Sequence, residues 1–340
     1  MVIRRVPILL AAIFSFAFIS AAGAEIKTDA EFNNFTSFYY LNPRPDQIPQ
    51  ALKYFIYSNL FRDGVKNNGQ MIEAAAYFFG RTGQLDPYLL REYQRVFKAS
   101  DELGKLFLIS VFGVYRDKQV ELFLQESQKD APEGLQQKIA AVLAAPPLGR
   151  TSALQGVMRY QDLNFLWMEF FLTGQKEPIS RIIDVMNWED VLRVKVNLWL
   201  KQRRGKKEKE KFVELLRSDL RIGLDLDKQD FGFSTDLDCV YGTTELALRA
   251  QDKNMISYGE ASGKKLGLNA EDKLYMATKG TAMWALYSNS KQHPRVLQYC
   301  REELAARDDK SKNELKIIVD FASPPVQNLK DSTNTVAGPV

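Results

Sequence analysis

The feature that most constrains this chain is a pattern that recurs along it: an apolar segment ending in aromatic residues, a short polar turn, and a second segment with helical spacing. In "FFLTGQKEPISRIIDVM", the positions i, i+3 and i+7 are held by Ile179, Ile182 and Met186, which gives a helix one apolar face. Three further copies read "AAAYFFGRTGQLDPYLLREYQRVF", "LFLISVFGVYRDKQVELFLQES" and "MWALYSNSKQHPRVLQYCREEL". Each copy therefore predicts a helical hairpin.

The recurrence of the hairpin predicts an all-α fold. A single hairpin cannot bury its apolar faces alone, so we expect the copies to form a degenerate array of helical hairpins. This array would be either a solenoid of the tetratricopeptide or HEAT type or a pair of helical lobes. No copy meets the tetratricopeptide consensus, and the expected turns are irregularly spaced, near Thr82, Arg116, Thr173 and Ser290.

Two further signals support the hairpins. Proline suits the first turn of a helix, and it stands near the start of the second segment in three copies, at Pro87, Pro178 and Pro294. Small residues let neighbouring helix backbones approach closely, and they line two of the first segments. These residues are Ala74, Ala75, Ala76 and Gly80 in one segment, and Ala277, Gly280, Thr281 and Ala285 in the other.

The N-terminus is typical of a secretory signal peptide. Arg4 and Arg5 precede an apolar run over residues 8–19, and the Ala-Gly-Ala of residues 22–24 gives the small-x-small pattern that signal peptidase cuts. The alternative is a membrane anchor, but the run is shorter than the roughly 20 residues that a spanning helix needs. We expect cleavage at about Ala24 and a mature protein that is periplasmic or secreted.

The chain divides into five parts by composition. After the signal over residues 1–24, an N-terminal helical lobe is expected over 25–145 and a C-terminal helical lobe over 160–322. A connector rich in turn formers, residues 146–159, separates them. Residues 323–340 contain too few apolar side chains to bury and are expected to form a disordered tail.

The charge of the chain is nearly balanced, with 46 Lys and Arg against 42 Asp and Glu and a formal net charge of +4. Such a balance predicts no nucleic-acid partner. The strongest local charge is the basic run from Lys201 to Lys211. It predicts a contact for an anionic lipid surface or an acidic partner, and the alternative is a solvated helix junction. The candidate contact residues are Lys201, Arg203, Arg204, Lys206 and Lys207.

Only two cysteines are present, Cys239 and Cys300. In an oxidising compartment a lone pair favours a structural disulfide. Two buried free thiols are the alternative, because free cysteine behaves as a small apolar residue.

The sequence lacks the usual catalytic and metal motifs. His293 is the only histidine, which excludes a zinc site built on several histidines, and we expect it to be a polar turn residue. The acidic stretch Asp225–Asp238 fails the EF-hand pattern. It indicates a solvated loop, with another kind of calcium loop as the alternative. Phosphate-loop, dinucleotide, nucleophile-elbow and zinc-protease motifs are absent, so no cofactor and no metal are predicted.

Two glutamates keep a carboxylate enzyme open as an alternative. Glu169 and Glu245 stand in the most apolar surroundings of any glutamate in the chain. An enzyme acting on glycan or lipid would need such an acid in a cleft. A single glutamate in a mostly apolar helix is more often found at the edge of a groove or hairpin.

The segment "EFNNFTSFYYLNPRP" is unusually aromatic. It offers candidate partner contacts at Phe35, Phe38, Tyr39 and Tyr40. Phe32, Phe35 and Tyr39 also fall on one helical face, so the alternative is a helix that covers the end of the array.

Three segments, "FYYLNPRPDQIPQAL", "DLNFLWMEFFLTGQKEPISRII" and "MWALYSNSKQHPRVL", resemble helical proteins exported by Gram-negative bacteria. The resemblance implies export and a helical fold but no activity. The sequence as a whole favours an exported helical binding or scaffold protein that engages a protein or peptide and has no catalysis of its own. An envelope enzyme using Asp or Glu on glycan or lipid, and a factor associated with anionic lipid, are the alternatives.

Overall fold

The computed structural model describes residues 25–146, 157, 162–188 and 270–323. The predicted all-α fold is confirmed, because these ranges contain helices and turns and no strand. The helices are α1 (Asp29–Ser37), η1 (Tyr39–Leu41), η2 (Pro45–Gln47), α2 (Ile48–Tyr57), α3 (Asn59–Asn67), α4 (Gly69–Leu85), α5 (Leu89–Ala99), α6 (Glu102–Val114), α7 (Lys118–Lys129), α8 (Glu133–Ala144), α10 (Asp162–Thr173), α11 (Lys176–Met186), α16 (Ala270–Gln292), α17 (Pro294–Ala306) and α18 (Ser311–Ala322).

Side-chain caps explain where several helices begin. A capping box starts α1: the Thr28 hydroxyl accepts from the Glu31 backbone N–H, and the Glu31 carboxylate accepts from the Thr28 N–H at 2.9 Å. Asp101 and Asp117 cap α6 and α7 with one hydrogen bond each, and each accepts from the backbone N–H three residues ahead. Pro294 is the first residue of α17, as its position in the sequence predicts.

Two of the four predicted turns lie where the sequence places them. The turn at Arg116 joins α6 to α7, and Thr173 is the last residue of α10 before the turn to α11. Thr82 and Ser290, in contrast, lie inside α4 and α16, and the turns follow Leu85 and Gln292. The prediction at Thr82 was wrong because its polar side chain is satisfied inside the helix: the Thr82 hydroxyl donates to the Phe79 carbonyl at 2.7 Å.

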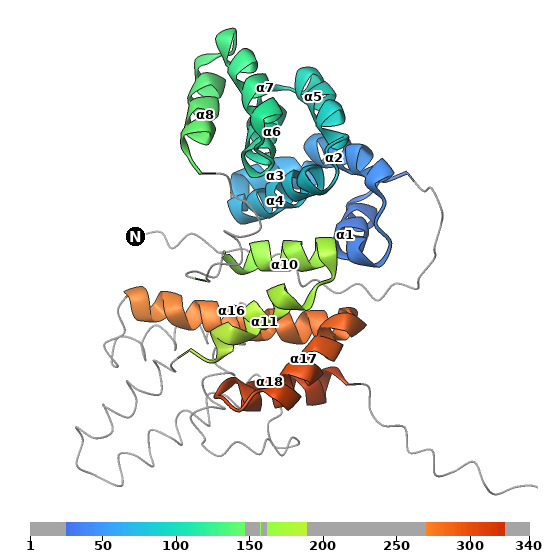
Figure 1. Ribbon diagram of the computed structural model, residues 1–340, viewed down its shortest axis with the longest axis vertical. Coiled ribbons are helices and arrows are strands. Elements are labelled where there is room, and N and C mark those ends of the chain that lie inside the picture. The colour runs from blue at the N-terminus through green and yellow to red at the C-terminus, as the bar shows by residue number, and fades with distance from the viewer. Residues whose placement is uncertain (1–24, 147–156, 158–161, 189–269, 324–340) are drawn as a thin grey trace, which may run out of the picture.

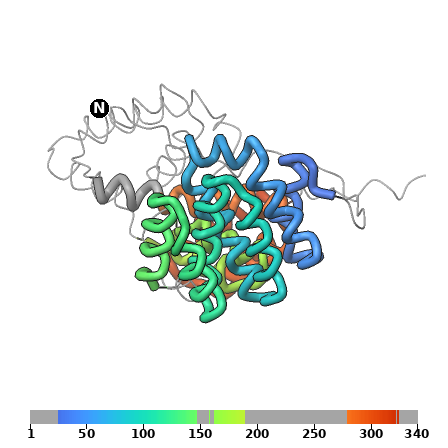
Figure 2. Tube along the Cα trace, turned by 90° about the horizontal axis from the view of Figure 1, so that it is seen from above, coloured from blue at the N-terminus to red at the C-terminus, as the bar shows by residue number. Residues whose placement is uncertain are grey.

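The helices stack in layers, with α10 between the two ends of the molecule (Figure 1). On one side α10 packs against α4 and η1, and on the other against α11, which in turn packs against α16, α17 and α18. Figure 2 shows the N-terminal helices covering the C-terminal helices when viewed from above. A single hydrophobic cluster runs through the described residues of both predicted lobes.

Aromatic rings fill much of the N-terminal core. Phe55 lies at its centre, with ring centroids 5.1 Å from Phe32, 5.4 Å from Phe61 and 5.3 Å from Phe107. Contacts of this kind contribute beyond the area that they bury. The N-terminal core is therefore built around aromatic rings from α1, α2, α3 and α6.

Close approach of α4 and α6 depends on glycine. A Cβ atom at Gly80 would lie 2.7 Å from the Val111 carbonyl oxygen and would also overlap Val114. The predicted role of small residues in this helix is thus confirmed at Gly80. Within the described ranges, no helix combines the length and the apolar character needed to cross a lipid bilayer.

Candidate functional site

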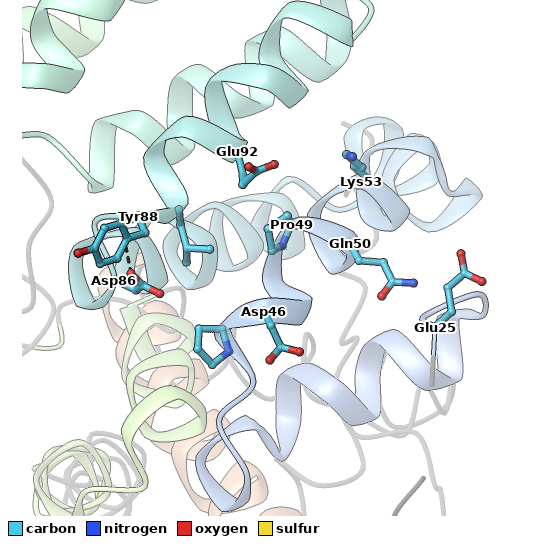
Figure 3. Close-up of a pocket in the computed structure, with 10 residues that line it drawn as sticks. Glu25, Asp46, Pro49, Gln50, Lys53, Asp86, Tyr88 and Glu92 are labelled. Carbon is cyan, nitrogen blue, oxygen red and sulfur yellow. Dashed lines mark hydrogen bonds between the residues drawn. The ribbon is translucent and has the colours of Figure 1, made fainter. Parts of the chain in front are cut away.

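A groove of about 730 Å³ opens to solvent beside η2 and α2, facing the turn between α4 and α5 (Figure 3). Both apolar and charged side chains line it, and they come from separate segments of the chain. The lining residues are Glu25, Pro45, Asp46, Pro49, Gln50, Lys53, Asp86, Tyr88, Leu89 and Glu92.

Rigid local structure positions the walls of the groove. Pro45 opens η2 and Pro49 lies in the first turn of α2, so the backbone φ angles of this wall are fixed. On the opposite wall, Asp86 follows the last residue of α4, and its carboxylate accepts from the Tyr88 backbone N–H at 3.1 Å. The Tyr88 side chain is 89% exposed. An aromatic ring is thus presented to solvent from an ordered turn.

Negative charge predominates among the lining residues. Four carboxylates, those of Glu25, Asp46, Asp86 and Glu92, stand against the single ammonium of Lys53. In the part of the chain that the structure describes, Asp86 has no basic partner. The other three each pair with a cation that does not line the groove: Glu25 with Lys27, Asp46 with Arg44 and Glu92 with Arg95.

Tyr39, in η1, is a buried tyrosine that responds to the charges of two of these carboxylates. Burial raises the pKa of Tyr39 to about 12, with a smaller contribution from the charges of Asp86 and Asp46. Hydrogen bonds from Arg44 hold the pKa of Asp46 below its usual range, so Asp46 stays ionised at neutral pH.

Glu169, the candidate acid, lies apart from the groove in a buried ion pair. Its side chain is fully buried, and both oxygens accept from Arg81, at 3.0 Å each. The Tyr77 hydroxyl donates to Oε2 of Glu169 at 2.9 Å. Arg81 and Tyr77 stand one helical turn apart on α4, so this cluster joins α10 to α4. A carboxylate held in this way matches a structural role better than proton transfer.

His293 occupies the turn between α16 and α17, as predicted, but it is buried rather than solvated. Only 1% of it is exposed, and burial lowers its pKa to about 4. Its ring packs against Phe38, Phe170 and Phe171, at centroid distances of 4.5, 6.0 and 5.3 Å. The local sequence reveals only the turn. The burial comes from Phe38 and Phe170, which are remote in the chain.

The candidate aromatic contacts are placed inside the protein or against its core. Tyr39 and Tyr40 are each 7% exposed, and Phe35 and Phe38 are half-buried. The Tyr39 ring packs edge-on against Phe78 at 5.7 Å. The structure thus agrees with the alternative of a covering segment, since these rings fill space between helices instead of standing at the surface.

Several other candidates fall outside the described residues: Cys239, Glu245, the acidic stretch 225–238 and the basic run with Lys201, Arg203, Arg204, Lys206 and Lys207. The Cys300 thiol is buried, 3.6 Å from the Ser290 hydroxyl, and burial raises its pKa to about 11. The disulfide between Cys239 and Cys300 remains a prediction.

Nowhere in the described ranges do histidine, cysteine and acidic side chains gather in a way that could hold a metal ion. Comparison with protein-family models, with curated proteins and with solved structures found no match.

The groove was not predicted from the sequence. Two short signals were available: the prolines four residues apart at Pro45 and Pro49, and the Asp-Pro-Tyr turn at residues 86–88. Neither signal indicates that the two segments face each other, because 40 residues of helix and turn lie between them.

Proposed function

We propose that this protein is an exported helical binding protein that engages a protein or peptide partner through the groove, with no catalysis of its own. The observation that supports this function best is the open groove with an exposed tyrosine, set against a candidate acid, Glu169, whose oxygens are already occupied. The alternatives are an envelope enzyme acting through Asp or Glu, whose second candidate acid Glu245 lies outside the described ranges, and a factor bound to anionic lipid through the basic run, which also lies outside them.

Tyr88 is suited to anchor a partner. Its ring is exposed, yet its backbone is fixed by the Asp86 carboxylate, so little backbone entropy is lost when a partner covers it. Exposed aromatic residues of this kind often provide most of the binding energy at an interface. Pro45, Pro49 and Leu89 supply apolar surface beside it.

The charge of the groove favours a cationic segment of a partner protein, one that carries lysine or arginine. Asp86 has no basic partner among the described residues, and the lining has four carboxylates for one lysine. The ion pairs of Glu25, Asp46 and Glu92 are with exposed or half-exposed cations, and such pairs contribute only about 0–1 kcal/mol. They therefore oppose a competing lysine or arginine only weakly.

This proposal can be tested with a displayed library of random peptides selected on the purified protein. We expect the enriched peptides to contain lysine or arginine. Combining Tyr88→Ala with Asp86→Asn should weaken their affinity at least tenfold, about 1.4 kcal/mol, because the variant loses both the ring and the unpaired carboxylate. Fluorescence polarisation with labelled peptides measures the affinity, and raising the salt concentration should weaken binding to the wild type.

A matched control is Leu122→Ala combined with Asp130→Asn. Leu122 is 58% exposed and Asp130 is exposed, and both belong to α7 or the turn after it, away from the groove. This control should bind as the wild type does. Peptides without enrichment of basic residues, or peptides that bind the groove variant as tightly as the wild type, would contradict the proposal.

A further inference from the structure

The imidazole of His293 lies where the segment before α2 meets α10 and the start of α17. Tyr40, in η1, approaches it from the N-terminal side, with the Tyr40 hydroxyl 3.3 Å from Nδ1 of His293. Phe38, just before η1, lies 4.5 Å away between ring centroids. Phe170 and Phe171 of α10 complete the enclosure. The ring thus fills the contact between the segment Phe38–Leu41 and the C-terminal helices.

The same contact is closely packed around Gly174. Gly174 has a positive φ of 62°, and a Cβ atom there would lie 2.7 Å from the Tyr40 ring. The Gly174 carbonyl accepts from the Tyr299 hydroxyl at 2.8 Å. Tyr40 is therefore held between the α10–α11 turn on one side and His293 on the other, and it has little room to adapt to a change in either.

Aromatic rings and one hydroxyl, and no carboxylate, face His293 within the described ranges. Tyr40 and Phe38 face it from the η1 side, and Phe170 and Phe171 from α10. On α17 the titratable groups near this contact are Arg295, whose guanidinium lies 5.1 Å from the centre of the Tyr40 ring, Tyr299, whose hydroxyl donates to the Gly174 carbonyl, and the buried Cys300. From α16, Asn289 accepts the His293 backbone N–H through its carbonyl. Within the described ranges no carboxylate contacts the imidazole.

We propose that His293 is a pH-sensitive latch: its neutral ring holds the segment Phe38–Leu41 against α10 and α17, and its protonation releases that segment. A buried imidazolium without a carboxylate partner is strongly disfavoured. Once the segment Phe38–Leu41 is released, the His293 ring is exposed to water. Acid therefore shifts the equilibrium from the closed contact to the open one.

The direction and the pH range follow from the proton affinities of the two states. An exposed histidine has a pKa of 6.5, and burial lowers the pKa of His293 to about 4. The open state thus binds a proton more tightly. Above pH 6.5 the closed contact has its full stability. As the pH falls from 6.5 toward 4, the equilibrium constant for closure decreases about tenfold per pH unit.

The latch also regulates the groove, a consequence that rests on the proposed function. The segment Phe38–Leu41 leads within five residues to Pro45 and Asp46, which line the groove. Tyr40, which contacts His293, is therefore only five residues from Pro45. Release of this segment would displace one wall of the groove and lower its affinity for a partner in acid.

The first test needs no partner, so it does not depend on the groove. Because the chain has a single histidine, the Cε1 proton of the untagged protein gives one imidazole signal in NMR spectra. Its titration should have a midpoint well below 6. Hydrogen exchange at pH 7 and pH 4.5, corrected for intrinsic rates, should then show faster exchange at pH 4.5 in residues 38–47 than in the distant α7–α8 hairpin.

The variant His293→Gln supplies the comparison, because glutamine does not titrate in this range. The excess exchange of residues 38–47 at pH 4.5 should disappear in it. If this variant fails to fold, the wild-type titration and exchange still decide the matter. A midpoint at or above 6, or equal acid effects on residues 38–47 and on α7–α8, would overturn the latch. If the wild-type protein binds no peptide at pH 7, that result contradicts the proposed function of the groove and leaves the latch unaffected.

Discussion

Replacing Arg81 with methionine is expected to lower the free energy of unfolding by about 3–5 kcal/mol. Arg81 donates to both oxygens of Glu169, which is fully buried. Methionine fills much of the same volume but removes the guanidinium that donates to both oxygens of the buried carboxylate. The cost is that of a buried acid separated from its cation, and urea denaturation followed by circular dichroism measures it.

Two further variants separate the charge from the packing. The double variant Arg81→Met with Glu169→Leu removes both charges, and we expect it to recover most of the loss, since a buried ion pair contributes little over apolar residues of similar size. Arg95→Met breaks an exposed pair with Glu92 and should change stability by less than about 1 kcal/mol. An Arg81→Met effect as small as that of Arg95→Met would contradict the importance of the buried ion pair for stability.

Gly80→Ala is expected to destabilise the protein by about 3 kcal/mol, the upper end of the range for overpacking. The new methyl group would meet the Val111 carbonyl oxygen at 2.7 Å and the Val114 side chain as well. A backbone carbonyl inside α6 cannot rotate away as a side chain can, so α4 and α6 must separate. The midpoint of thermal or urea unfolding reports the change.

Gly69→Ala is the matched control in the same helix. Gly69 is the first residue of α4, and a Cβ atom there would have no neighbour within 4 Å. Alanine also restricts the unfolded chain more than glycine does, so this variant should be neutral or stabilised by up to about 1 kcal/mol. Equal effects of the two substitutions would mean that helix propensity, not the α4–α6 contact, determines the result.

Local patterns in the sequence predict the helices well, because helical spacing and capping are local properties. Ile179, Ile182 and Met186, predicted to form one face, are all fully buried in α11. Gly80 was predicted to permit a close contact, and it does. The error at Thr82 shows the limit of local patterns: "GRTGQ" is rich in turn formers, yet it is helical, with the Thr82 hydroxyl satisfied by the Phe79 carbonyl and α4 packed against α6 and α10.

The site residues could not be predicted in the same way, since their partners lie far away in the chain. Glu169 meets Arg81 across 88 residues, and His293 meets Tyr40 across 253. Periodicity identifies the face that a helix buries but not the helix that covers it. The groove could not be predicted for the same reason, because its two walls come from segments remote in the chain: η2 with α2, and the α4–α5 turn with α5.

The position of α10 has a practical consequence for anyone who divides this chain. By sequence, α10 is the first helix of the C-terminal half, yet it packs on α4 and carries the carboxylate that neutralises Arg81. A fragment ending at residue 146 would leave a guanidinium and an apolar layer uncovered, and we expect it to aggregate. A fragment extended to Thr173 would retain both partners but would uncover the face of α10 that packs against α11. Because α10 is packed on both sides, a cut on either side of it exposes an apolar face.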